Sequence, residues 1–166
     1  MHQFSLINLE SYNHENFNNV NIDGYKIIES KKALFERSET KISGKATDWI
    51  VSPASGDIKC TGGENAMLWL MHDGLEASTR FEKPSSAVAF LIHGDHNDGF
   101  ADFYVNNLHI GTIDMHESNY KALVINNLNE EKPHTLMVKV SGKQNKKSKG
   151  THVHICAGFA LKPSGQ

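Results

Sequence analysis

The segment from His93 to His116, HGDHNDGFADFYVNNLHIGTIDMH, concentrates side chains that can do chemistry. It carries four of the ten histidines in the 166-residue chain. The donors at its start are His93, Asp95, His96 and Asp98. Imidazole and carboxylate groups of this kind bind metal ions, transfer protons or form hydrogen bonds to polar ligands.

Three interpretations of this acidic and histidine-rich loop follow from its spacing. An EF-type calcium loop has the pattern D-x-[DN]-x-[DN]-G, and residues 95–99 are one residue too short for it. A zinc site needs three or four donors, so a histidine from another strand would have to join. A polar turn without a ligand is the third interpretation, because Asn, Asp and Gly favour turns. These residues identify no particular cofactor, and calcium and a divalent transition metal both remain candidates.

A second pair of candidate residues lies near the end of the chain, in THVHICAGFAL. His152 and His154 are two positions apart, so on a strand both imidazoles point to one face, about 7 Å from each other. Such a pair can bridge a metal ion or act in acid–base chemistry. A solvated or partly covered sheet face is the alternative.

The third group of candidate residues belongs to a predicted hairpin. Asn106-Asn107 joins FADFYV to LHIGTID and suits a two-residue primed turn, because Asn tolerates positive φ. The register pairs Val105 with Leu108, Tyr104 with His109 and Phe103 with Ile110. It places Phe103, Val105, Leu108 and Ile110 on the core side and Asp102, Tyr104 and His109 on the other side. A tyrosine beside polar groups is a platform for a sugar ring, whereas a cross-strand pair that only stabilises the sheet is the alternative.

The neighbouring segments show the alternation that would position these groups. In HTLMVKVSG it directs Leu136, Val138 and Val140 inward, and Met137 and Lys139 outward. In THVHICAGFAL it directs Val153 and Ile155 inward, and His152, His154 and Cys156 outward. The segment SSAVAFLIHG is apolar on both faces, which predicts a central strand covered on both sides.

Short strands and frequent turns dominate the rest of the chain. Turn signals such as SPASGD, TGGEN, HDG and NDG separate these runs at short intervals, which is typical of a β-sandwich or barrel. We therefore expect an all-β, antiparallel jelly-roll β-sandwich over residues 41–166. Residues 1–40, rich in Asn, Glu and Lys with one short strand at Tyr25–Ile28, would pack on the sandwich or lead into it.

From Trp49 to Leu161 the order of motifs resembles the galactose-binding-like jelly-roll modules appended to bacterial glycoside hydrolases. The segments that carry the resemblance are CTGGENAMLWL, STRFEKPSSAVAFLI, DGFADFYVNNLHIGTIDM and EEKPHTLMVKVSGKQNKKSKG. The chain departs from the pattern at Asn106-Asn107, where Asp-Gly is usual, and at Cys156, where an Asp is often found. These are scaffold motifs, so the resemblance implies the fold and, less directly, a carbohydrate ligand.

Composition excludes several classes of function. The net charge is −2, with 22% charged residues, so the chain lacks the excess positive charge that is typical of proteins binding nucleic acid or an anionic membrane. No apolar run reaches the roughly 20 residues of a membrane helix. No secretory signal is visible, so we expect a cytoplasmic protein, or a secreted one if a signal peptide has been removed. Cys60 and Cys156 are expected to be reduced, buried thiols, with their pairing left open.

The prediction is a non-catalytic module that binds a carbohydrate or another small polar ligand. The two tryptophans differ in expected role: Trp49 in a turn would face the ligand, and Trp69 would pack in the core. The predicted ligand-binding residues are Trp49, His93, Asp95, His96, Asp102, Tyr104, His109, His152 and His154. The alternatives are a small stand-alone enzyme using His/Asp acid–base or metal-assisted chemistry, and an accessory subunit with a protein partner. Self-association into a homo-oligomer also stays open.

Overall fold

The computed structural model describes residues 3–9, 20–33, 45–46, 48–52, 58–60 and 68–165, which form β-strands and no α-helix. The strands are β1 (Gln3–Asn8), β2 (Tyr25–Lys32), β3 (Lys45–Ala46), β4 (Trp49–Ser52), β5 (Ile58–Cys60), β6 (Leu68–Leu70), β7 (Glu76–Arg80), β8 (Ala87–His93), β9 (Phe100–Val105), β10 (Leu108–Asp114), β11 (Lys121–Asn126), β12 (Thr135–Val140) and β13 (Val153–Pro163). Within these ranges there is no helix long and apolar enough to cross a membrane.

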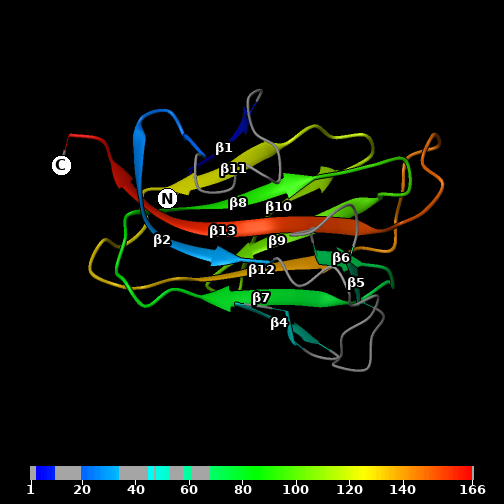
Figure 1. The fold of residues 1–166 in the computed structure, drawn as a ribbon, viewed down its shortest axis with the longest axis horizontal. Helices are drawn as coiled ribbons and strands as arrows, with labels where there is room; N and C mark the ends of the chain where they lie inside the picture. Colours follow the sequence, from blue (N-terminus) through cyan, green and yellow to red (C-terminus); the bar gives the residue numbers. More distant parts are fainter. Residues whose placement is uncertain are drawn as a thin grey trace.

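Two antiparallel sheets stack face to face (Figure 1). The first has the order β1-β11-β8-β13-β6-β5, with β2 also pairing with β13. The second has the order β10-β9-β12-β7-β4-β3. Neighbours in each sheet are mostly distant in sequence, as expected of a jelly roll. The predicted all-β sandwich is therefore confirmed.

The space between the sheets is filled by alternate residues of the strands. On β12 the side chains of Leu136, Val138 and Val140 are buried, whereas Met137 and Lys139 between them are half-buried on the outer side. This alternation agrees with the prediction. Burial of apolar surface of this kind is the main favourable term in folding, at about 25 cal/mol per Å².

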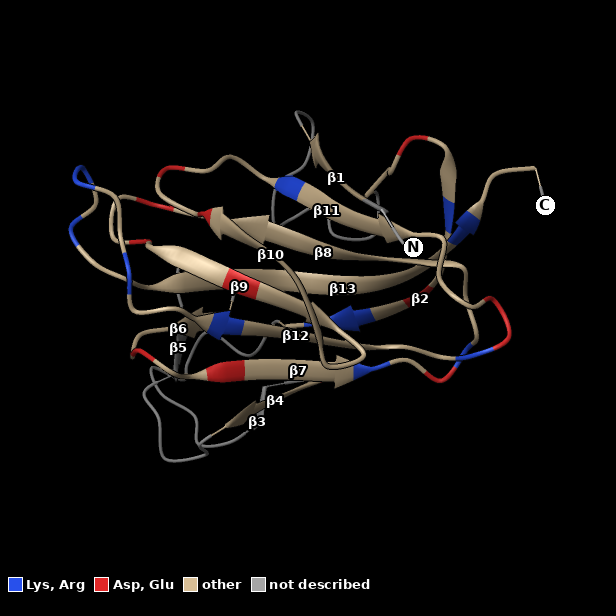
Figure 2. Cartoon of the chain, turned by 180° about the vertical axis from the view of Figure 1, so that it is seen from behind, with Lys and Arg blue, Asp and Glu red and all other residues tan. Residues whose placement is uncertain are grey.

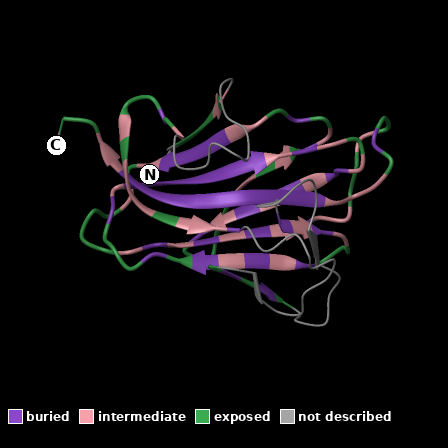
Figure 3. Ribbon diagram, viewed as in Figure 1, coloured by how far each residue is buried: buried purple, intermediate pink, exposed green. Residues whose placement is uncertain are grey.

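The first sheet carries a second apolar layer on its outer side. Its central strands β8 and β13 are buried along almost their whole length (Figure 3). Ile22 is 1% exposed and packs with Leu91 and Phe159 in a cluster separate from the inter-sheet core. The prediction that β8 is a central, doubly covered strand is confirmed, and β13 shares this environment. Cys156 lies in the same outer cluster as a free, buried thiol; the side chain of Cys60 lies outside the described part.

The β9–β10 hairpin follows the prediction at its turn and departs from it further along. Asn106 and Asn107 have φ of 52° and 66°, as a primed turn requires. A β-bulge then shifts the register, so Phe103 pairs with Gly111. The predicted pairing of Phe103 with Ile110 is therefore wrong. Leu108 is also no core residue, since it is 54% exposed at the edge of the sheet.

Candidate functional site

The loop between β8 and β9 is held tightly at one end of the sandwich. A Cβ at Gly94 would lie 1.6 Å from the carbonyl oxygen of Met115, and one at Gly99 would lie 2.4 Å from that of Lys143. Only glycine fits such close approaches between backbones. The loop is also tied to the start of β13, because the N–H of Gly99 donates to the carbonyl of His152 at 2.9 Å.

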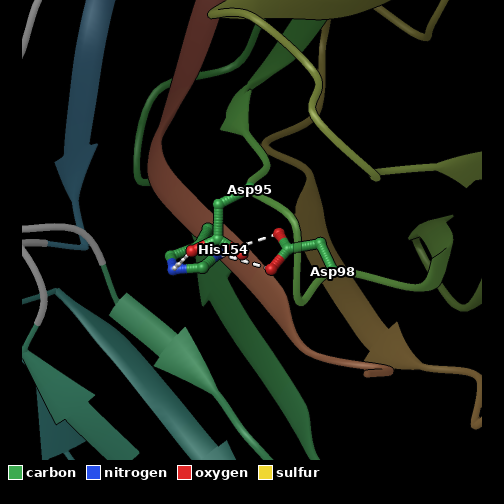
Figure 4. A group of neighbouring side chains, drawn as sticks. All are labelled: Asp95, Asp98 and His154. Carbon is green, nitrogen blue, oxygen red and sulfur yellow. Dashed lines mark hydrogen bonds and ion pairs between the residues drawn. The ribbon is translucent and has the colours of Figure 1, made fainter. Parts of the chain in front are cut away.

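This loop brings Asp95 and Asp98 to His154 on β13 (Figure 4). The Nδ1 atom of His154 lies 2.8 and 2.9 Å from the two carboxyl oxygens of Asp98. Its Nε2 atom lies 3.9 Å from Oδ2 of Asp95. One carboxyl group thus faces each nitrogen of the imidazole ring.

Burial separates the roles of the two carboxyl groups. The side chain of Asp98 is fully buried, that of His154 is 2% exposed, and that of Asp95 is 38% exposed. Burial, and then the neighbouring charge of Asp95, raises the pKa of Asp98 to about 10. Burial lowers the pKa of His154 to about 4. Burial opposes ionisation of Asp95 as well, but the hydrogen bond from the N–H of Asn97 and the charge of His154 lower its pKa.

The ring of His154 is fixed by aromatic neighbours on adjacent strands. Trp69 on β6 stacks on it, with ring centroids 5.6 Å apart and planes 13° apart. His93 on β8 lies on the other side at 6.5 Å, and it packs in turn on Tyr120 at 4.4 Å. The rings of Trp69, His154 and His93 lie in one row across three strands. The strand register explains this row, because His154 pairs directly with both Trp69 and His93. His152 lies at the Trp69 end of this row, where the Nδ1 atom of His152 accepts a hydrogen bond of 2.9 Å from the indole N–H of Trp69.

A second group of polar residues lies on the outer face of the other sheet. The Nε2 atom of His109 lies 3.3 Å from Oδ1 of Asp102 and 3.3 Å from Oγ1 of Thr112, and the Thr112 hydroxyl donates to the same oxygen of Asp102. Tyr104 contacts His109 edge to face at 5.2 Å. The bulge makes this possible, because the extra residue places His109 and Thr112 on the same face.

The surroundings of this second group are open. His109, Tyr104, Met137, Ser78 and Ile50 form one row across five strands in the strand register. Ile50 is 63% exposed, and the side chain of His109 is 48% exposed. The adjacent row includes an ion pair of 3.6 Å between Lys139 and Glu76. Figure 2 looks onto this face, with β9, β12 and β7 in front.

With one exception, the predicted ligand residues therefore lie in two separate regions. His93, Asp95, His152 and His154 gather at the β8–β9 loop, with the exposed His96 beside them. Asp102, Tyr104 and His109 share the open face, as predicted. Trp49 is the exception, because it is fully buried and its indole N–H donates to the carbonyl of Lys31 at 2.9 Å. The prediction that Trp49 faces the surface is wrong.

Three residues of these regions were not among the predicted ligand residues. Trp69 was expected in the core, but it lies half-buried on the outer side of β6, between the buried Leu68 and Leu70. Asp98 was considered as a metal donor, and nothing in the sequence signalled that it would be fully buried. For Thr112 a signal existed, because a glycine inside a strand pattern, here Gly111, often marks a bulge.

Comparisons with known proteins support the fold. No family model matches the sequence, and no curated protein matches it. Among solved structures, the chain is similar to a two-domain esterase (CEX) active on acetylated mannans, co-crystallised with mannopentaose. The TM-score is 0.52 at 6% identity, over 76% of this chain and 37% of the esterase. It is also similar to a family two carbohydrate esterase from Cellvibrio japonicus, with a TM-score of 0.50 at 13% identity, over 80% and 34% of the two chains.

A third similar structure is a smaller domain. It is the CBM36-1 domain of a multidomain xylanase from the hindgut metagenome of Trinervitermes trinervoides, with a TM-score of 0.49 at 12% identity, over 83% of this chain and 98% of that domain. The chain spans about a third of the length of the two esterases that it matches. At these identities the similarity concerns the fold alone, and it agrees with the antiparallel β-sandwich expected from the sequence.

Proposed function

We propose that the chain is a carbohydrate-binding module whose ligand lies across the open face of the second sheet. The observation that carries the proposal is the group around Tyr104, where one exposed patch combines an aromatic ring with Asp102, His109 and Thr112. Sugar rings present axial C–H groups to an aromatic face and hydroxyl groups to polar neighbours. This patch offers both kinds of contact.

The remainder of the face suits an extended ligand better than a single sugar. Met137 and Ile50 add apolar surface in the same row as Tyr104, and Ser78 lies between them. Strands in a sheet lie about 4.8 Å apart, so this row of five strands spans about 19 Å, room for several linked sugar rings. The fold supports the proposal, since two of the similar structures belong to enzymes that act on carbohydrates.

Calorimetric titration with mannopentaose, followed by a glycan array, tests the proposal. Mannopentaose is the first ligand because a structurally similar esterase was crystallised with it. Tyr104→Ala removes the aromatic platform and should weaken binding about tenfold, which corresponds to about 1.4 kcal/mol. The matched control is Phe4→Ala, since Phe4 is an exposed aromatic residue on the other sheet, 55% exposed. It should leave the affinity unchanged.

Two results would contradict the proposal. One is the absence of binding to every glycan by a sample that circular dichroism shows to be folded. The other is an equal loss of affinity in Tyr104→Ala and Phe4→Ala, which would move the site away from this face.

A further inference from the structure

We propose that the first sheet carries a second, separate sugar site, a pocket for one pyranose ring at the end of the sandwich opposite the β8–β9 loop. The pocket lies where β11 and β13 end and β2 and β8 begin (Figure 1). Its volume is about 430 Å³, within the roughly 300–1,000 Å³ of small-molecule sites. The residues that line it include Tyr25, Ser86, Asn126, Leu128, Glu130 and Pro163.

The order of the strands creates this pocket. Asn126 ends β11 and Tyr25 begins β2, and β8 and β13 lie between these two strands in the sheet. Nevertheless, Nδ2 of Asn126 donates to the hydroxyl of Tyr25 at 3.3 Å. The contact is possible because Ala87, the first residue of β8, has only a methyl side chain. The space above this methyl group is the pocket, with Tyr25 and Asn126 as its walls.

The walls are held in place by backbone hydrogen bonds. The N–H of Leu128 donates to the carbonyl of Ser86 at 2.9 Å, which fixes the chain after β11 against the start of β8. The N–H of Ser164 donates to the carbonyl of Gly24 at 3.0 Å, and Pro163 pairs with Tyr25 in the strand register. A ligand entering a pocket with fixed walls does not have to order them, so less conformational entropy is lost.

The amide of Asn126 offers an unused hydrogen-bond acceptor beside the pocket. Among the described residues, nothing donates to its Oδ1 atom, which is buried. A buried acceptor without a donor raises the free energy of the folded state. The terminal torsion of asparagine is soft, so a small rotation can bring Oδ1 to a hydroxyl group placed in the pocket.

The chemistry of the lining favours a neutral sugar. The described residues that line the pocket include no lysine or arginine, so an anion would find no positive charge there. Hydroxyl groups of Tyr25 and Ser86 can donate and accept, and the carboxylate of Glu130 can accept from two neighbouring hydroxyls. The ring of Tyr25 and Pro163 provide apolar surface for C–H groups. Hydroxyl-binding groups around an apolar surface match a pyranose ring.

This pocket is separate from the open face on which the proposed glycan lies. The pocket belongs to the first sheet and its adjoining loops, and the open face belongs to the second sheet. A chain with both sites could therefore hold two sugar ligands at once. Loss of binding on one face should leave the other unchanged, so the two proposals can fail independently.

The test is an NMR titration of the full chain and of the Tyr104→Ala variant, in which the open face is impaired. D-mannose, D-glucose, D-galactose and D-xylose are added in turn, each as the free sugar and as its methyl glycoside. We expect at least one of them to shift the backbone amide signals of Asn126 and Leu128, equally in both proteins. Shifts with the methyl glycoside indicate the end of a glycan chain as the ligand, and shifts with the free sugar alone indicate a free monosaccharide.

Two adjacent carboxylates provide a matched pair of variants. Glu130 and Glu131 are both exposed, but only Glu130 lines the pocket. Glu130→Gln should weaken binding of the sugar about fivefold, because hydrogen bonds to a charged group are the stronger ones. Glu131→Gln should leave the affinity unchanged. Asn126→Ala should weaken binding about tenfold, and circular dichroism checks that this variant is folded.

Three results would overturn the proposal. The first is that none of the sugars shifts the amide signals of Asn126 and Leu128. The second is that Tyr104→Ala abolishes these shifts, which would place the sugar on the open face. The third is an equal effect of Glu130→Gln and Glu131→Gln on the affinity.

Discussion

Two Asp–His pairs in this molecule have the same chemistry and different surroundings. Asp98 and His154 lie 2.8 Å apart, are almost fully buried, and sit between a tightly held loop and a central strand. Asp102 and His109 lie 3.3 Å apart on an open sheet face, with side chains 22% and 48% exposed. Water can replace the second interaction but not the first. Burial therefore decides which pair the fold depends on and which pair is free to bind a ligand.

Removing one carboxyl group from each pair should give the largest contrast. Asp98→Ala leaves a buried nitrogen of His154 without its hydrogen-bond partner and should lower the free energy of unfolding by about 2–3 kcal/mol. Asp102→Ala should cost less than about 1 kcal/mol, because water solvates the group that remains. Urea denaturation followed by fluorescence measures both variants. Equal losses would show that burial does not distinguish the pairs.

Glycine substitutions test the backbone of the two regions. In Gly94→Ala the new Cβ would meet the backbone of Met115 at 1.6 Å, so the loop must move, at a cost of about 2 kcal/mol or more. In Gly111→Ala the nearest atoms belong to the Phe4 ring, at 3.7 and 4.0 Å. That change should stay within about 0.5 kcal/mol. Thermal unfolding of both variants measures the difference, and a stable Gly94→Ala protein would argue against a rigid loop.

The pH dependence of stability tests the buried pair alone. Burial, then the charge of Asp95, raises the pKa of Asp98 to about 10, and burial lowers the pKa of His154 to about 4. The folded pair therefore holds one proton from about pH 4 to about pH 10. The unfolded pair also holds one, but loses it near the ordinary histidine pKa of 6.5. Above that pH the folded state binds more protons, so stability falls as pH rises, by about 1.4 kcal/mol per unit at most.

The variant Asp98→Asn moves this effect to the acid side. Asparagine cannot hold the shared proton, so the alkaline decline should disappear. His154 remains neutral in the folded state, and stability should then fall as pH drops from 6.5 towards 4. Denaturation curves at several pH values measure both slopes. An unchanged alkaline slope in the variant would assign the effect to other groups.

The sequence predicted the features that depend on local geometry. The Asn106-Asn107 turn, the alternation in β12 and the doubly apolar β8 all follow from the backbone preferences of a few adjacent residues. These features were sufficient to predict the β-sandwich, and with it the shared face of Asp102, Tyr104 and His109.

The errors arise where distant parts of the chain meet. Alternation places His154 opposite Val153 and Ile155, but it does not reveal that further strands and rings bury that side of the sheet. Trp49 and Trp69 were assigned to the wrong environments for the same reason, because the partners that bury or expose them are far away in sequence. The bulge after His109 changes the register by one residue, and the hydrophobic pattern alone gave no position for it.

The pairing of β2 with the last strand, β13, also bears on aggregation. Without β2, its residues from Ala157 to Leu161, AGFAL, would form an apolar edge to which a strand of another chain could add, as in aggregation. β2 occupies that edge along Ala157–Pro163 and carries four charged residues, Lys26, Glu29, Lys31 and Lys32. Charged edge strands resist pairing with further copies. β2 thus places a charged strand where the apolar β13 would otherwise end this part of the sheet.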